Sequence, residues 1–388
     1  MNPRGLVILG STGSIGRSTL DVVDRHPESF RVLALAARSS IEVLVEQYRK
    51  YRPRYICVVD PAQELALRNQ IGNEKVEVLT GEADLVRLTT LPEADVVVNA
   101  VVGAAGLRAS LETIKQNKIL ALANKESLVT GGPLFAPLLE QGKAKVFPID
   151  SEHSAIWQAM MSGRREEVRQ LLLTSSGGPF RNLPANRFGD ITVEQALNHP
   201  TWKMGPKITI DSATLANKGL EVIEAVTLFG VSADLIKVVI HPQSIVHSMV
   251  EFIDSSVIAQ MSMPDMRLPI TYALFWPRRI ESNFGKIDWT KPITITFEQP
   301  DLEKFPLLTT AFDVARTGGT APAIFNAANE IAVEAFLNGT LRFTEIADII
   351  RKTLDAVSMI GRPELEDILD ADRVARRIAH ERLERIAC

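Results

Sequence analysis

The chain has 388 residues, 46% of them hydrophobic and 23% charged, which is ordinary for a globular protein of two or three domains. Its formal net charge of −4, with both signs interspersed, offers no basic surface, so we do not expect nucleic-acid binding. No apolar run approaches the roughly 18 residues that cross a bilayer, and two cysteines, Cys57 and Cys388, form no disulfide framework, so we expect a cytoplasmic protein without membrane contact.

The first predicted strand leads directly into a glycine turn. The apolar run 6–9 is followed by Gly10-Ser11-Thr12-Gly13-Ser14-Ile15-Gly16 and then by a helical pattern. Glycines let the backbone approach a pyrophosphate, whose charge then meets the free N–H groups at the helix N-terminus. A glycine triplet alone is a weak signal, but its place after the first strand predicts a dinucleotide site.

The second predicted strand, 32–37, is followed by Arg38, Ser39 and Ser40. An enzyme that uses NAD normally carries an acid here, which hydrogen-bonds the ribose 2′-hydroxyl. A guanidinium and two hydroxyls suit a 2′-phosphate instead, so this segment predicts NADPH rather than NADH. The alternative is a solvated loop arginine without a ligand.

Further apolar runs alternate with helical patterns through the first 150 residues. The predicted strands cover residues 55–59, 76–79, 96–100 and 119–123, and the helices include 41–50 and 107–116. Continuously apolar strands are typical of a parallel sheet that is covered on both faces, so we expect a doubly wound, Rossmann-like sheet with its ligands at the carboxyl ends of the strands. Three segments stand at such ends, which are Ala100 to Gly103, Asn124 to Glu126 and Asp150 to Glu152.

Two carboxylates, Asp150 and Glu152, follow the apolar run 146–149. In extended backbone, residues i and i+2 point to one side, so the two side chains should project together. Because they repel, either one is protonated, or a cation lies between them, or solvent separates them on a surface turn. The surface turn is the common case, but the shared rim with the other polar groups favours the cation.

The middle of the chain contains a second glycine turn and a long irregular segment. The predicted strand 171–175 ends at Ser176, where the following glycines could present donors to an anion or form a plain turn. Residues 181–206 have little periodic pattern and carry His199 and Trp202, which is typical of a mobile lid or of an irregular packed loop.

The segment 208–225 can place Lys218, Glu221 and Glu224 on one helical face, which is either a solvated salt-bridge pair or part of a site. Ser212, Asn217 and Lys218 provide the donors that phosphate oxygens accept. For the histidines of this region, which are His153, His199, His241 and His247, a hydrogen-bonded structural role is favoured over metal ligation because no paired spacing is present.

The last third of the chain is predicted to be a supporting helical domain. Residues 293–297 alternate as a half-exposed strand does, and amphipathic helical patterns cover 311–315, 321–337, 346–357 and 370–386. We therefore expect a C-terminal helical domain without ligand motifs.

Together these strings resemble the 1-deoxy-D-xylulose 5-phosphate reductoisomerase family over essentially the whole chain. The matching segments are Gly10 to Gly16, Ala123 to Leu128, Asp150 to His153, Ser176 to Phe180, Asn217 to Glu221, His241 to Ser244 and Asn326 to Glu330. The resemblance implies an NADPH-binding domain over 1–150, an α+β catalytic domain over 151–285 with a lid at about 177–206, a linker over 286–310 and a helical domain over 311–388.

The resemblance also assigns roles to residues. It implies that Asp150, Glu152 and Glu221 bind one Mg²⁺ or Mn²⁺ ion. The implied catalytic residues are Lys125, Glu152, His199 and His247. The implied substrate contacts are Ser151, Ser176, His199, Trp202, Ser212, Asn217, Lys218 and Glu221, of which Ser176, Ser212, Asn217 and Lys218 hold the phosphate. The implied NADPH contacts are Gly10, Ser11, Thr12, Gly13, Ser14, Ile15, Gly16, Arg38, Ser39, Ser40, Ala100, Asn124 and Glu126.

The implied reaction rearranges a phosphorylated ketose, by cleavage and rejoining rather than by a direct shift, and reduces the resulting aldehyde to 2-C-methyl-D-erythritol 4-phosphate. We also expect a homodimer, which an exposed sheet face of the middle domain would carry. Two rivals stay open at this point. A different NADPH-dependent, metal-requiring oxidoreductase such as a semialdehyde dehydrogenase would need a catalytic cysteine in a motif, and an NADPH-binding regulator would have a disabled site.

Overall fold

The computed structural model describes residues 3–103, 106–202 and 204–387, which leaves out Cys388. The chain forms two compact units, and each is discontinuous in sequence. The first unit contains Met1–Ser127, Pro137–Ser154 and Asp265–Phe284. The second contains Leu128–Ala136, Ala155–Pro264 and Gly285–Cys388.

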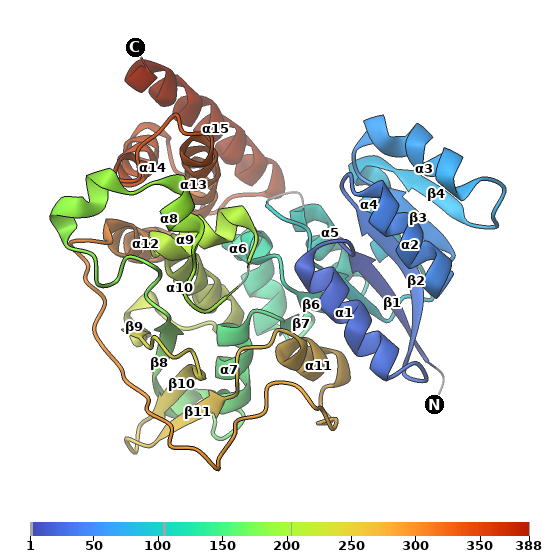
Figure 1. The fold of residues 1–388 in the computed structure, drawn as a ribbon, viewed down its shortest axis with the longest axis horizontal. Helices are drawn as coiled ribbons and strands as arrows, with labels where there is room; N and C mark the ends of the chain where they lie inside the picture. Colours follow the sequence, from blue (N-terminus) through green and yellow to red (C-terminus); the bar gives the residue numbers. More distant parts are fainter. Residues whose placement is uncertain (1–2, 104–105, 203, 388) are drawn as a thin grey trace. The chain divides into compact units, whose positions relative to one another are not determined.

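The first unit is built on a seven-stranded sheet with the order β4-β3-β2-β1-β5-β6-β7, in which every pair of neighbours is parallel (Figure 1). The strands are β1 (Arg4–Leu9), β2 (Phe30–Ala37), β3 (Tyr55–Val58), β4 (Glu77–Thr80), β5 (Val96–Asn99), β6 (Ile119–Leu122) and β7 (Lys145–Pro148). The strand order reverses at β1, which lies between β2 and β5, and this is where a doubly wound sheet binds its ligand. The predicted fold class is confirmed.

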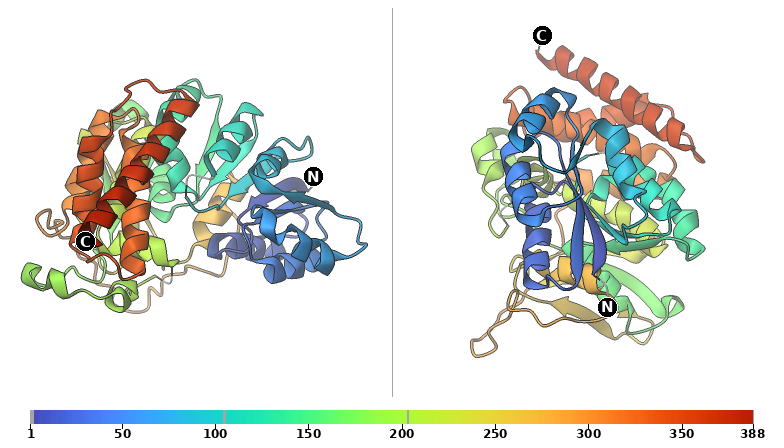
Figure 2. Two further views of the ribbon diagram at one scale, coloured as in Figure 1. Left: turned by 90° about the horizontal axis from the view of Figure 1, so that it is seen from above. Right: turned by 90° about the vertical axis from the view of Figure 1, so that its right-hand side faces the viewer.

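Helices cover both faces of this sheet (Figure 2). They are α1 (Ser14–Arg25), α2 (Ile41–Tyr51), α3 (Glu64–Ile71), α4 (Gly81–Thr89), α5 (Leu107–Lys115) and the start of α6 (Lys125–Glu140). Residues of β1, β2, β3 and β5 are almost entirely inaccessible, which explains why these strands are continuously apolar in sequence.

A segment from the middle of the sequence completes the first unit. Helix α11 (Arg267–Phe275) packs beside α1, and the ring of Phe275 meets Phe30 edge to face at 5.1 Å between centroids. Trp276 contacts Phe147 of β7 with a centroid distance of 5.2 Å. The domain division predicted from sequence assigns this segment to the catalytic part, and that functional division stays a prediction.

The second unit has a four-stranded sheet with the order β11-β10-β8-β9. Its strands are β8 (Val168–Ser175), β9 (Ile236–Ile240), β10 (Val246–Phe252) and β11 (Val257–Met261). Only β8 and β9 are parallel. The strand predicted at 293–297 is wrong, because these residues have no strand structure and the next residue, Glu298, forms only an isolated bridge to Ile240.

Helices dominate the rest of the second unit (Figure 1). They are α7 (Ser151–Met160), which begins in the first unit, α8 (Val193–Leu197), α9 (Pro206–Ala213), α10 (Ala216–Phe229), α12 (Pro306–Thr317), α13 (Ala321–Leu337), α14 (Glu345–Ala356) and α15 (Leu365–Ala387). Helix α13 is buried along nearly its whole length, as its apolar sequence requires. Helices α10 and α12 approach so closely that a Cβ atom on Gly219 would lie 2.5 Å from the Cβ of Ala311.

Within the described ranges, every helix is too short or too polar to cross a bilayer.

Candidate active site

The glycine turn after β1 has the close backbone packing that a pyrophosphate loop needs. Gly10 has a φ of +83°, and a Cβ atom there would lie 2.4 Å from the carbonyl oxygen of Ala100. A Cβ atom on Gly16 would lie 2.4 Å from the Gly10 oxygen. Both positions therefore require glycine. Gly13 is the N-cap of α1, so the free N–H groups of that helix point into the turn.

Of the remaining residues of the turn, one is buried and the others are accessible to solvent. Ser11 is buried, and its hydroxyl donates to Gln47 Oε1 at 2.7 Å while Gln47 Nε2 donates back to the Ser11 carbonyl at 2.9 Å. The side chain of Ser11 thus holds the glycine turn against α2. Thr12, Ser14 and Ile15 remain accessible, and so do Arg38, Ser39 and Ser40, which follow β2.

Asn124 supports the loop after β5. It is the N-cap of α6, with Oδ1 accepting from the Ser127 N–H at 3.1 Å. Its Nδ2 donates to the carbonyls of Val101 and Gly103, both at 2.8 Å, and to Glu126 Oε2 at 3.0 Å. The sequence suggested a ligand contact here, and the observed bonds of Asn124 hold the loop after Ala100 in place.

Asp150 and Glu152 lie close together as predicted, but the extended backbone predicted for them is wrong. Asp150 and Glu152 do not lie on extended chain, because Asp150 precedes α7 and Glu152 is in its first turn. The Asp150 carboxylate accepts from the Glu152 N–H at 3.3 Å, as a helix N-cap does, and this brings the two acids to the same helix end. The Ser151 hydroxyl donates to Glu152 Oε2 at 2.6 Å.

Lys125 neutralises part of this acidic cluster. Its ammonium lies 2.7 Å from Asp150 Oδ2, and the two side chains are only 8% and 13% exposed. An ion pair this well shielded needs good geometry to repay its desolvation, so both groups are held in fixed positions. The segments that follow β6 and β7 therefore present one oriented ammonium and two oriented carboxylates.

In the second unit, three residues that were predicted to contact the substrate meet at one point. The Nε2 atom of His199 lies 3.1 Å from the Ser176 hydroxyl and 3.1 Å from the Ser212 hydroxyl. Ser176 follows β8, and Ser212 is in the last turn of α9. The glycines after Ser176 permit this approach, because a Cβ atom on Gly178 would lie 2.7 Å from the Ser212 carbonyl oxygen.

The hydrogen bonds of His199 define its tautomer. Its Nδ1 accepts from the backbone N–H groups of Thr201 at 3.1 Å and Trp202 at 2.9 Å, so Nδ1 carries no proton. In the neutral ring the proton is on Nε2, which faces the two hydroxyls. Burial lowers the pKa of His199 from its ordinary value of 6.5, which keeps the ring neutral at neutral pH.

The contribution of the neutral His199 ring to the stability of the fold depends on pH. Because the folded-state pKa of His199 lies below 6.5, the stability from the neutral ring is complete above about pH 6.5 and is lost as the pH falls through the lowered pKa. Protonation of Nδ1 also removes the bonds from Thr201 and Trp202. We expect a ring titration midpoint below 6.5 by NMR, and a weaker acid dependence of unfolding in His199→Gln. A midpoint at or above 6.5 would contradict the assignment.

Helix α10 carries a polar cluster of three residues, of which Lys218 and Glu221 are buried. Asn217 Nδ2 donates to Glu221 Oε1 at 2.6 Å, and Lys218 Nζ donates to Glu221 Oε2. Lys218 is 3% exposed and Glu221 is 1% exposed. The reading of this face as a solvated salt-bridge pair is therefore wrong. A charged pair that is shielded from water, with an amide added, is typical of a functional site.

His247 and Trp202, two further residues that were predicted to belong to the site, lie close together in the second unit. His247 Nε2 contacts Ser262, with 2.8 Å to the hydroxyl, and the rings of His247 and Trp202 are 6.4 Å apart. His241 has the structural role that the sequence favoured. Its Nε2 accepts from the N–H groups of Ile245 and Val246, both at 3.1 Å, and so holds the turn between β9 and β10.

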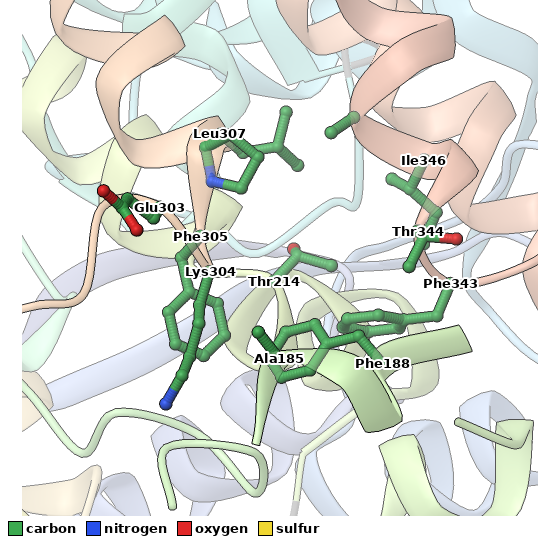
Figure 3. Close-up of a pocket in the computed structure, with 12 residues that line it drawn as sticks. Ala185, Phe188, Thr214, Glu303, Lys304, Phe305, Leu307, Phe343, Thr344 and Ile346 are labelled. Carbon is green, nitrogen blue, oxygen red and sulfur yellow. The ribbon is translucent and has the colours of Figure 1, made fainter. Parts of the chain in front are cut away.

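The predicted lid segment is anchored over much of its length. Phe180, Phe188, Ile191 and Ala196 are part of the hydrophobic core, and Phe188 packs against Phe305 and Phe343. These three rings border a cavity of about 230 Å³, beside Thr214 (Figure 3). From 197 to 205, leaving aside residue 203, which lies outside the described residues, no side chain is buried in the core.

The dehydrogenase rival would need a catalytic cysteine, and Cys57 is the only cysteine among the residues that the structure describes, because Cys388 lies outside them. Cys57 is buried in β3, and burial raises the pKa of its thiol to about 12. A thiol with so high a pKa is a poor nucleophile at neutral pH.

Comparisons with known proteins agree with these features. Three family models match the chain. The model described as 1-deoxy-D-xylulose 5-phosphate reductoisomerase matches residues 6–132, the C-terminal domain of the same enzyme matches 146–229, and the DXP reductoisomerase C-terminal domain matches 261–378. The 1-deoxy-D-xylulose 5-phosphate reductoisomerase of Chlorobaculum tepidum is 51% identical over 378 residues, which are 97% of this chain and 99% of the relative.

Solved structures give the same result. The reductoisomerase from Zymomonas mobilis in complex with NADPH has a TM-score of 0.92 and 41% identity, with 98% of this chain and 99% of that chain covered. A DOX-P reductoisomerase in complex with NADPH, fosmidomycin and magnesium has a TM-score of 0.93 and 39% identity, with 98% of each chain covered. The prediction of an NADPH-dependent, metal-dependent conversion of 1-deoxy-D-xylulose 5-phosphate is confirmed for the family, whereas the route by cleavage and rejoining stays a prediction. The chain belongs to the 1-deoxy-D-xylulose 5-phosphate reductoisomerase family, whose members are NADPH-dependent oxidoreductases.

Proposed function

We propose that this chain converts 1-deoxy-D-xylulose 5-phosphate to 2-C-methyl-D-erythritol 4-phosphate, using NADPH and one divalent cation. The observation that carries the proposal is the meeting of Ser176, His199 and Ser212, with the shielded Lys218 of α10 six residues after Ser212 in the sequence. Two hydroxyls, an Nε2–H and an ammonium form a set of donors for a phosphate monoester. A solved relative that binds NADPH, fosmidomycin and magnesium together supports the combination of ligands.

The metal ligands in this proposal are Asp150, Glu152 and Glu221. All three offer carboxylate oxygens, which hard cations such as Mg²⁺ and Mn²⁺ prefer. The donor set fits, because Asp150 and Glu152 share one helix end and Glu221 is oriented by Asn217 and Lys218. When bound, the cation supplies Lewis-acid polarisation and a template for two substrate oxygens.

The protein's own groups orient the substrate. Ser176, Ser212, Asn217 and Lys218 hold the phosphate. Lys125, which Asp150 fixes at 2.7 Å, and Ser151 donate to the hydroxyls and carbonyl of the carbon chain. His199 donates its Nε2–H to the phosphate, and His247 lines the site beside Trp202. Glu221 contacts the substrate only through its place in the metal set.

NADPH occupies the glycine turn in this proposal and supplies the hydride that reduces the aldehyde. Its pyrophosphate lies on the N-terminus of α1, and Arg38, Ser39 and Ser40 hold its 2′-phosphate. Ala100, Asn124 and Glu126 border the cofactor through the loop after β5, which Asn124 holds in place.

Closure over the substrate concerns a shorter stretch than the sequence suggests. Because Phe188 and Ile191 are core residues, the part that we propose to move lies within residues 197–202 and carries His199 and Trp202. Its closure excludes water and strengthens the electrostatic contacts within the site.

The direct test is an assay of NADPH oxidation with 1-deoxy-D-xylulose 5-phosphate. We expect turnover that stops when a chelator removes divalent cations and returns when Mg²⁺ or Mn²⁺ is added. Turnover that persists unchanged after complete chelation would refute the metal requirement, and a folded protein without any turnover would refute the proposed activity.

We also propose a homodimer that forms through β11. This strand is at the edge of its sheet, and Val257 and Ile258 are 47% and 36% exposed. An exposed apolar edge strand is a template for pairing with a second copy. We expect Ile258→Glu to halve the mass measured by light scattering. Leu65→Glu on α3, which is also exposed, is the control that should leave the mass unchanged. A wild-type monomer would contradict the dimer.

The compartment we propose is the cytoplasm, where a free thiol such as Cys57 stays reduced.

A further inference from the structure

Helix α13 carries a string of polar residues that take no part in the proposed site. It runs from Asn326 to Glu330 in a helix that carries neither a ligand group nor a proposed metal ligand. Both asparagines are fully buried. A buried amide must be paired to repay its desolvation, so its partner reveals what the residue holds in place.

Asn329 is bonded to the helix that presents Ser212. Its Nδ2 donates to Asp211 Oδ1 at 2.8 Å, and the other carboxylate oxygen of Asp211 lies 2.8 Å from Lys207 Nζ. Asp211 is 1% exposed and immediately precedes Ser212 in α9. The bond therefore joins α13 to the turn of α9 from which the Ser212 hydroxyl reaches His199.

On its other side, the turn of α9 that carries Ser212 is prevented from moving by close backbone packing. A Cβ atom on Gly178 would lie 2.7 Å from the Ser212 carbonyl, so α9 has no room to move toward the turn after β8. Movement away from that turn would take the Ser212 hydroxyl out of reach of His199 Nε2, now at 3.1 Å. The bond from Asn329 opposes movement in that direction.

We propose that Asn329 is a positioning residue for the substrate phosphate, acting through Asp211 to set the place of Ser212. This inference rests on the proposed function, because it concerns the same phosphate site. It gives the C-terminal helices a task in substrate recognition, whereas the sequence alone suggested only support.

Asn326 provides a matched control on the same helix. It is equally buried and also donates to a carboxylate, but that carboxylate is Glu330, at 3.0 Å, which pairs with Arg376 of α15. Asn329→Asp and Asn326→Asp therefore make the same chemical change, and each places one carboxylate against another. Only the first change disturbs the helix that carries Ser212.

The test compares the two variants by steady-state kinetics and thermal unfolding. We expect N329D to raise the KM for 1-deoxy-D-xylulose 5-phosphate by about tenfold, because a displaced donor weakens phosphate binding, while the KM for NADPH changes less than about twofold. N326D should lower the unfolding temperature similarly and change neither KM by more than about twofold. The exchanged pair Asp211→Asn with Asn329→Asp restores a donor facing an acceptor and should recover most of the lost affinity.

The outcomes separate this inference from the proposed function. Equal KM values for the phosphorylated substrate in N329D and N326D, or parallel changes in both KM values of N329D, would overturn the positioning role while leaving the activity intact. If wild type shows no turnover, the proposed function fails, and a titration with inorganic phosphate then decides the role of Asn329 by the same comparison. If N329D does not fold, Asn329→Ala replaces it without adding a charge.

Discussion

Replacement of Glu221 by glutamine is expected to lower kcat/KM by about 10³-fold, because the change removes one charge from the proposed metal set and keeps the side-chain shape. The Lys218 ammonium would then be shielded from water without its carboxylate, which costs stability of the order of 3 kcal/mol. Activity is therefore measured at a temperature where the variant is folded. Binding of Mn²⁺, followed by electron paramagnetic resonance, should weaken in parallel with kcat/KM.

Glu330 offers a control of nearly the same design. Its carboxylate also accepts from an asparagine four residues away, Asn326, and pairs with a cation, Arg376, at 2.5 Å. Glu330→Gln should lower stability, by less than the Glu221 change because Glu330 is more exposed, and should leave kcat and Mn²⁺ binding unchanged. If both variants lost activity equally, or if E221Q retained most of its turnover, Glu221 would not be a metal ligand.

The double change Arg38→Asp with Ser39→Ala is expected to shift the preference for NADPH over NADH by about 10²-fold or more. A guanidinium makes charge-assisted hydrogen bonds to a phosphate, each of about 1.5–3 kcal/mol, and an aspartate would repel the same group and bind a ribose hydroxyl. Both side chains are exposed after β2, so the change should cost little stability. The measurement is the ratio of kcat/KM for the two cofactors.

Arg31 is the matched control because it is an exposed arginine at the other end of the same strand. Arg31→Asp makes the same change of charge far from the carboxyl end, and it should leave the cofactor ratio within about twofold of wild type. An unchanged ratio in the Arg38 variant would mean that this arginine is a solvated loop residue, which is the alternative that the sequence left open.

The sequence predicted the parallel sheet well because its signals are local. Strands buried on both faces must be apolar throughout, and the glycines at positions 10 and 16 are required by backbone contacts within one loop. The long helix 321–337 was predicted with its observed bounds for the same reason, since its residues are buried all round.

Other features depend on tertiary contacts that no local pattern reveals. The acid pair was placed on extended chain, although Asp150 caps α7, because strand and helix starts look alike over three residues. The face of α10 that reads as a solvated pair is shielded by the rest of the fold. Asp211 was not singled out, and the only trace of its role in the sequence is a charge at the end of an apolar run.

The first unit is assembled from three separate stretches of chain, and this has a consequence for protein synthesis. On the ribosome, β1 to β7 emerge long before Phe275 and Trp276, which cover Phe30 and Phe147. The nascent sheet must therefore leave these rings uncovered until the segment Asp265–Phe284 has been translated, and during that interval it presents a surface that chaperones bind.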